Sequence, residues 1–311
     1  MEWLEMGWDK TDHVHQLRAK ETAAAGEPSQ LSLTDLAGNE CKQQPNSNQI
    51  PVLKPDQSSS GCTFKTFSHA PGRLDVSSFF AKEKPHSVWI DANLWLGGMS
   101  EGSGVIVGKK SPAECIVLTD RHVVRGTQEQ EDRIADLEFI SNMKNSRPDI
   151  TVHATNGKKY PAEEVGEDPS RDLAALVVKT GPDTNSVCRL VDIPKKYHES
   201  PYGTSAYAIS YPQNSKTPYL SIGTVTGSLT LDEMNKRMGA DVAAQEKLTR
   251  PLIDDQLAIR HASSGAARYD YRGHFSGLID RENDKTGHAF STPLRRSDID
   301  SILAKPPVFP Q

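Results

Sequence analysis

From residue 87 onward the chain reads as a series of short extended segments separated by turn signals. Among them are the alternating "SVWIDANLWLG", the pair "SGVIVG" and "ECIVLTD" joined by "KKSPA", and the apolar "DLAALVVK". Asn156-Gly157 stands between two extended runs and predicts a β-hairpin, and "SAYAISYP" and "PYLSIGTVTGSL" continue the pattern. Many short strands with few helices predict an all-β fold, either a sandwich or a barrel.

Three segments depart from this strand pattern. Residues 129–144 and 231–248 have helical character, and we expect them to be helical insertions between strands. The stretch "PLRRSDIDSILAK" predicts a closing C-terminal helix before the helix breaker "PPVFPQ", with Arg295 and Arg296 on its solvated face.

The first 84 residues differ in composition from the remainder. They contain long stretches rich in Pro, Ser, Asn, Gln and Gly, which predict a loosely ordered N-terminal extension with one short helix near residues 11–24. The expected organisation is therefore an extension over 1–84, a folded domain over 85–306 and a tail over 307–311.

Charge and hydropathy exclude several classes of function. The chain of 311 residues has a net charge of -5 and a pI near 6.1, whereas a general nucleic-acid binder is usually basic. Its apolar runs are too short for a membrane span, and no secretory signal is visible at the start. We expect a cytoplasmic location by default, and a periplasmic or secreted one if an upstream segment is missing.

The four cysteines are Cys41, Cys62, Cys115 and Cys188. They form no Cys-x-x-Cys pair and lack zinc-site spacing, so we interpret them as structural residues or free thiols, with Cys115 buried in a strand. A Cys41–Cys62 disulfide is an alternative in an oxidising compartment. We expect neither a metal nor another cofactor.

The stretch "IRHASSGAARYDYRGHFSGLID" surrounds two serines with small residues, after a segment "PLIDDQLAIR" that resembles a loop leading into a strand. Its second half predicts a hairpin turning at Arg272-Gly273. Ser-Ser-Gly there serves either a tight turn or an exposed nucleophile. A serine nucleophile needs an imidazole base, and the imidazole needs an acceptor. His122 follows an apolar strand and Asp172 precedes one. Taken alone, a histidine at such a place is more often a surface or satisfied residue, and an aspartate there is usually a turn or capping residue.

Together, "GSGVIV", "LTDRHVV", "VGEDPSRDLAALVV" and "SSGAARYDYRGHFSGLI" resemble trypsin-like serine proteases of the HtrA/DegP type over residues 87–304. The order His, Asp, Ser is that of chymotrypsin. The resemblance implies two antiparallel six-stranded β-barrels packed together and a serine endopeptidase that forms an acyl-enzyme. It makes His122 the general base, Asp172 the residue that orients it, and Ser264 the nucleophile.

The resemblance fails at the glycines around the nucleophile, where this chain has Ala262, Ala266 and Ala267. The implied oxyanion hole consists of the backbone N–H groups of Ala262 and Ser264. Alanine at positive φ costs about 1 kcal/mol, and a flipped peptide would remove one donor, lowering the rate about 10²–10³-fold. Two functions follow: an active peptidase, or an impaired fold retained as a binding or scaffold protein. A metal-dependent hydrolase lacks support, since no His-Glu-x-x-His motif is present.

The implied specificity pocket has its base near Ala258, where no acid is available for Arg or Lys, so we expect small or medium apolar side chains in protein or peptide substrates. His261 is either part of that pocket or a solvated loop residue. No PDZ domain is expected after the protease region. Phe79-Phe80 either supports a homotrimer contact or packs onto its own barrel.

Overall fold

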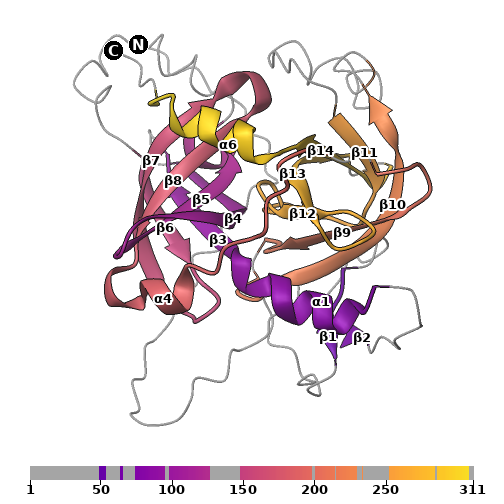
Figure 1. Cartoon of the computed structure of the whole chain (residues 1–311), viewed down its shortest axis with the longest axis horizontal. Helices are drawn as coiled ribbons and strands as arrows, with labels where there is room; N and C mark the ends of the chain where they lie inside the picture. The colour runs from indigo at the N-terminus through magenta and orange to yellow at the C-terminus, as the bar shows by residue number, and fades with distance from the viewer. Residues whose placement is uncertain are drawn as a thin grey trace, which may run out of the picture. The chain divides into compact units, whose positions relative to one another are not determined.

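The computed structural model describes residues 49–53, 64–65, 74–94, 98–126, 148–197, 200–213, 215–229, 233, 252–283 and 286–307. These residues form two closed six-stranded antiparallel barrels, as predicted (Figure 1). The expected insertion at 129–144, nearly all of that at 231–248, and the expected helix near 11–24 lie outside the described residues.

The first barrel has the strand order β3-β4-β5-β8-β7-β6. Alternate residues of these strands point inward, and Ile90, Val117 and Leu176 are among those that fill the interior. The predicted hairpin turn is present between β6 and β7, with Gly157 at φ 79°. The six strands are β3 (Ser87–Asn93), β4 (Met99–Ser111), β5 (Glu114–Asp120), β6 (Asp149–His153), β7 (Lys159–Asp168) and β8 (Leu173–Lys179).

The second barrel has the strand order β10-β11-β14-β13-β12-β9. Its strands are β9 (Ser205–Ser210), β10 (Tyr219–Leu229), β11 (Leu252–Gln256), β12 (Ala267–Tyr269), β13 (Phe275–Asn283) and β14 (His288–Pro293). The β12–β13 hairpin turns as predicted, with Gly273 at φ 80°. The interpretation of "PLIDDQLAIR" as a loop was wrong in its first half, because β11 pairs with β10 and β14 on its two sides.

The helical elements are short and lie outside the barrel strands. They are α1 (Val76–Glu83), η1 (Lys84–His86), α2 (Arg121–Arg125), η4 (Pro169–Arg171), η5 (Gly181–Asp183), α4 (Thr184–Val187) and α6 (Arg296–Leu303). The last confirms the predicted closing helix, and Arg295 and Arg296 are exposed at its start. No helix in the described part of the chain has the length and apolarity needed to cross a membrane.

Part of the predicted N-terminal extension packs onto the second barrel. Asp75 caps α1 by accepting hydrogen bonds from the N–H groups of Ser77 and Ser78. Phe79 on this helix contacts Tyr269 edge-on, with ring centroids 5.1 Å apart. Phe80 is also buried in the same core cluster, together with residues of β1 (Ile50–Pro51), which pairs with β2 (Phe64–Lys65). The phenylalanine pair therefore packs onto its own barrel.

A disulfide joins Cys115 on β5 to Cys188 after α4. Cys115 is a buried strand residue, as expected, but this pairing was not foreseen. The bridge spans a sequence separation of 73 residues, and closing a loop of that size stabilises a fold by about 4 kcal/mol in the chain-entropy account. Cys41 and Cys62, the other pair considered, lie outside the described residues.

Candidate functional site

His122 and Asp172 meet at the edge of the first barrel. The short helix α2 holds His122 because Val123 and Val124, next in sequence, are buried in the barrel core. Asp172 ends η4 directly before β8, with φ 55°. One carboxylate oxygen of Asp172 lies 2.5 Å from Nδ1 of His122, and the other accepts a hydrogen bond of 2.9 Å from the His122 N–H. Asp172 thus holds both the ring and the backbone of the histidine.

Charge stabilises this pair in its ionised form. Burial by itself lowers the pKa of His122, but the adjacent Asp172 and the charge of Asp280 outweigh burial and raise the pKa above 6.5. Burial raises the pKa of Asp172, yet His122 and Arg281 more than compensate and leave it below 3.8. The pair therefore favours an imidazolium beside a carboxylate.

Ser264 lies in the loop between β11 and β12, against both barrels. Its carbonyl accepts a 2.8 Å hydrogen bond from the N–H of Ser103 in the first barrel. Its hydroxyl donates to the carbonyl of Asp280 at 3.1 Å, and no hydrogen bond links it to His122 among the described residues. The neighbouring Ser263 is 1 % exposed and its hydroxyl points to Ser210, so Ser264 is the more accessible of the two serines.

The backbone around Ala262 leaves two N–H groups available beside Ser264. Ala262 has φ 67°, and its carbonyl accepts a 2.8 Å hydrogen bond from Oγ of Ser103. The preceding carbonyl, of His261, accepts from the N–H of Gln213 at 2.7 Å. Because C=O and N–H of one trans peptide point in opposite directions, the Ala262 N–H points away from Gln213. Neither it nor the Ser264 N–H donates to another described residue.

Strained backbone is concentrated at this site. Within the described part of the chain, Asp172 and Ala262 are the two residues other than glycine with positive φ. Such conformations cost about 1 kcal/mol or more and persist where the surroundings impose them. Both residues belong to the set that the sequence singled out.

A second group of charged residues surrounds His122, and the sequence reasoning missed it. Asp120, His122 and Asp280 have carboxylate and imidazole atoms within 4.8 Å of one another. Oδ1 of Asp280 accepts a 3.0 Å hydrogen bond from Nε of Arg281, whose guanidinium also lies 3.8 Å from Asp172. Since Arg281 already supplies positive charge among these carboxylates, we do not assign a metal here. The available signal was an acid at the end of each apolar run, in "IVLTD" and "GLID".

The two residues expected at the specificity pocket lie in different environments. Ala258 is 5 % exposed and packs with Leu53 and Tyr219. Its carbonyl accepts a 2.5 Å hydrogen bond from Oγ of Ser221. The side chain of His261 is exposed. The geometry places His261 next to Ala262 on the loop surface, and Ala258 in a packed interior.

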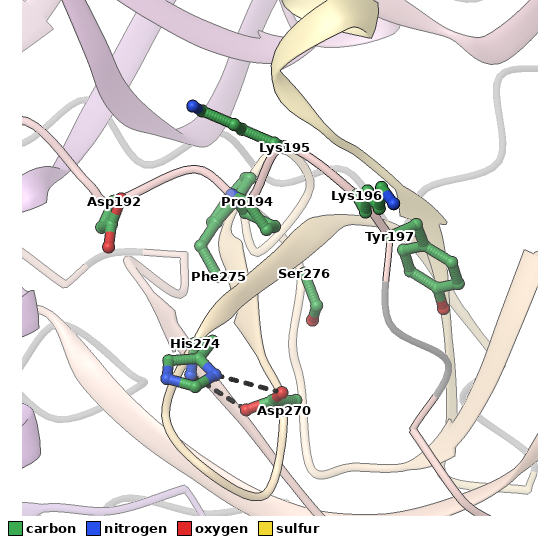
Figure 2. A pocket seen from close by; sticks show the side chains of 9 residues that line it. All are labelled: Asp192, Pro194, Lys195, Lys196, Tyr197, Asp270, His274, Phe275 and Ser276. Atoms are coloured by element: carbon green, nitrogen blue, oxygen red, sulfur yellow. Dashed lines mark hydrogen bonds and ion pairs between the residues drawn. The ribbon is translucent and has the colours of Figure 1, made fainter.

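A cavity of about 400 Å³ lies elsewhere, between the segment that follows α4 and the β12–β13 hairpin (Figure 2). His274 and Asp270 lie side by side at the bottom of the view, with Ser276 above them. Lys195 points away from these residues in the same view. The lining includes none of the predicted site residues, and its charged groups do not converge on one point, so we assign it no function. The full lining is Asp192, Pro194, Lys195, Lys196, Tyr197, Asp270, His274, Phe275 and Ser276.

Comparison with solved structures supports the fold. The active form of the Rv3671c protease from M. tuberculosis is 20% identical, with a TM-score of 0.53 over 80% of this chain and 96% of that chain. A serine endoprotease from Yersinia pestis is also 20% identical, with a TM-score of 0.50 over 76% of this chain and 68% of that one. At this level of identity the likeness concerns the fold alone.

Comparison with sequences gives two results. No curated protein matches the chain significantly. A family model described as a trypsin-like peptidase domain matches residues 102–278, which is more than half of the chain and includes His122, Asp172 and Ser264. The chain therefore belongs to the family of trypsin-like peptidase domains.

Proposed function

We propose that the protein is a serine endopeptidase, in which His122 takes the proton of Ser264 and Ser264 attacks the carbonyl of a peptide bond. The observation that carries this proposal is the hydrogen bond between Nδ1 of His122 and the carboxylate of Asp172, at 2.5 Å. A carboxylate at Nδ1 leaves Nε2 as the nitrogen that accepts a proton, and it stabilises the imidazolium that results. An acyl-enzyme and release of the amine then follow, with the proton passing from His122 to the leaving nitrogen.

The N–H groups of Ala262 and Ser264 are the proposed oxyanion hole. Both lack a described acceptor, so both are available to a developing negative charge. Ser103 supports them, since its N–H and Oγ hold the carbonyls of Ser264 and Ala262. The alanine at this position is therefore compatible with two donors, at the strain of its positive φ.

Ser264 must change rotamer for this chemistry, because its hydroxyl is bonded to the Asp280 carbonyl. Catalytic hydrogen bonds are often incomplete before substrate binds. Asp120 accepts from the N–H of Gly265 at 2.8 Å, and its carboxylate lies within 4.8 Å of the His122 ring nitrogen. The nucleophile and the base are thus attached to the same small cluster. We propose proteins or peptides as substrates, cleaved next to a small or medium apolar side chain.

Labelling with a fluorophosphonate probe tests the proposal. We expect the wild-type protein to be labelled and Ser264→Ala to be unlabelled, while Ser263→Ala, which removes the adjacent buried hydroxyl, keeps its label. The same outcome is expected for cleavage of an unfolded protein substrate.

The bond between Ser264 and the Asp280 carbonyl favours a second candidate, a catalytically impaired fold that serves as a binding or scaffold protein. Absence of labelling in a folded wild-type protein, at every pH between 5 and 9, would reject the peptidase and favour that candidate.

A further inference from the structure

The cluster around His122 contains more acid than one triad needs. Asp172 and Asp280 act both on Asp120 and on His122, and Arg281 is the guanidinium among them. Asp120 and Asp280 are both 0% exposed. Carboxylates this close and this buried do not all ionise, because each charge opposes the next. We therefore expect at least one of the three carboxyl groups to be protonated while the others are ionised.

Hydrogen bonds show which acid holds the charge. Asp280 accepts from the guanidinium Nε of Arg281 at 3.0 Å, a charge-assisted contact that favours its ionised form. Asp120 accepts through Oδ2 from the neutral N–H of Gly265, which gives its carboxylate no positively charged donor. Burial, followed by the charges of Asp280 and Asp172, raises the pKa of Asp120 well above 3.8. Burial and the neighbouring carboxylates therefore favour the neutral form of Asp120 over that of Asp280.

The charged groups facing His122 can be named element by element. Asp120 comes from the end of β5, Asp172 from the end of η4, and Asp280 and Arg281 from β13. On the helix of His122 itself, Arg121 bonds Glu167 and Arg125 bonds Glu164, each at 2.8 Å, so these two arginines are neutralised by β7. The net charge that acts on the ring is set by Asp172, Asp280 and Arg281.

We propose that Asp280 is a positioning residue of the candidate triad: its carboxylate, with Asp120 kept as a neutral acid, provides a second negative charge that stabilises the protonated ring of His122. This inference rests on the proposed function. In the reaction, the ring becomes positive when the proton of Ser264 Oγ moves to it, and it becomes neutral again when that proton leaves with the amine. A second carboxylate stabilises the positive stage of this cycle.

The same residue also contacts the nucleophile. Asp280 lies at a β-bulge. The register of β13 with β14 shifts between Ile279 and Arg281, so Asp280 has no paired residue on β14. The bulge frees its carbonyl, which accepts the hydroxyl of Ser264 at 3.1 Å. Asp280 therefore contacts Ser264 through its backbone and acts on His122 through its side chain.

Titration of the His122 ring by NMR tests the proposal without requiring proteolysis. The His122 signal among the 10 histidines is assigned by its loss in His122→Gln. We expect Asp280→Asn, which keeps an acceptor for Arg281, to lower the pKa of His122 by about one unit. Arg281→Gln is expected to raise it. Asp120→Asn is expected to change it far less than Asp280→Asn, because it replaces a neutral acid by a neutral amide.

The matched control is Asp254→Asn, which removes another buried carboxyl of the second barrel, bonded to His288. It is expected to leave the His122 titration unchanged. An unchanged titration in Asp280→Asn overturns the proposal, as does an equal shift in Asp120→Asn. If Asp280→Asn does not fold, Arg281→Gln takes its place as the test. A fall rather than a rise in the pKa of His122 in Arg281→Gln would then overturn the proposal. Shifts as expected in a protein that no probe labels would reject the peptidase function and leave the charge assignment standing.

Discussion

Two histidine–aspartate pairs in the first barrel have nearly equal contacts but different surroundings. Nδ1 of His122 lies 2.5 Å from Asp172, and Nε2 of His153 lies 2.6 Å from Asp91. His153 and Asp91 belong to regular strands, β6 and β3, and Trp89 stacks on the His153 ring with centroids 3.9 Å apart. The histidine of the second pair is covered by an indole, and no hydrogen bond joins it to a serine, threonine or cysteine side chain in the described structure.

The backbone makes the difference between the two pairs. His122 lies in a helical turn directly after a strand, and Asp172 has positive φ. Both irregular segments face a loop of the second barrel that carries Ser264, with Gly265 bonded to Asp120 across the barrels. A carboxylate on an imidazole is therefore a common structural pair. It becomes a candidate for catalysis where strained backbone brings a hydroxyl and free N–H groups to the same place.

Replacing each histidine by alanine gives the largest expected contrast. We expect His122→Ala to lower the turnover rate about 10⁶-fold, because it removes the general base. His153→Ala should keep the rate within about twofold, as for a residue remote from the chemistry. Steady-state cleavage of a quenched fluorescent peptide measures both, with thermal unfolding as the control for folding. Equal losses in the two variants would remove the distinction between the pairs.

The aspartates provide the next contrast. Asp172→Asn keeps the shape of the side chain and tolerates positive φ, but it takes away the charge that fixes the tautomer of His122. We therefore expect the turnover rate to fall about 10⁴-fold. Asp91→Asn should have little effect on the rate. The same peptide assay measures both, and a change confined to KM in Asp172→Asn would argue against its role.

The pH profile sharpens the comparison further. His122 must be unprotonated to act as a base, and its raised pKa moves the acidic limb of kcat/KM to a midpoint above 6.5. Below that midpoint kcat/KM is expected to fall about tenfold per pH unit. The stability from protonated His122 has the opposite trend: it is fully present below about 6.5 and is lost as pH rises through the folded-state pKa. His153→Gln should leave the midpoint of the acidic limb of kcat/KM unchanged. A shift of that midpoint in His153→Gln would contradict this account.

The smallest expected effect is at Ala262. Glycine adopts positive φ without strain, so Ala262→Gly should raise the free energy of unfolding by at most about 1 kcal/mol. Since the N–H of residue 262 is already available, the turnover rate should stay within about threefold of wild type. Urea unfolding and peptide cleavage measure the two quantities. A rate increase as large as about 10²-fold, the effect of regaining one oxyanion donor, would show that alanine displaces that donor.

Local sequence patterns predicted an all-β fold, and the resemblance to trypsin-like proteases implied its two six-stranded barrels. Alternating residues and turn signals such as Asn156-Gly157 indicated strands and hairpins, because these depend on short-range geometry. Where long-range pairing decides, the prediction was weaker. Strand β11 was interpreted in part as a loop. The disulfide between Cys115 and Cys188 was not predicted, because the residues around Cys115 do not indicate which cysteine pairs with it across 73 residues.

The sequence by itself determined the strand-rich fold class, the order of His122, Asp172 and Ser264, and the alanine at 262, because these follow from residue types and local periodicity. Only the tertiary structure decided that Asp120, Asp280 and Arg281 surround His122, that Ser103 supports Ala262, and that the Ser264 hydroxyl rests on a carbonyl. Burial, charge and hydrogen bonding between distant segments arise when two barrels close and meet, and no short stretch of the chain encodes them.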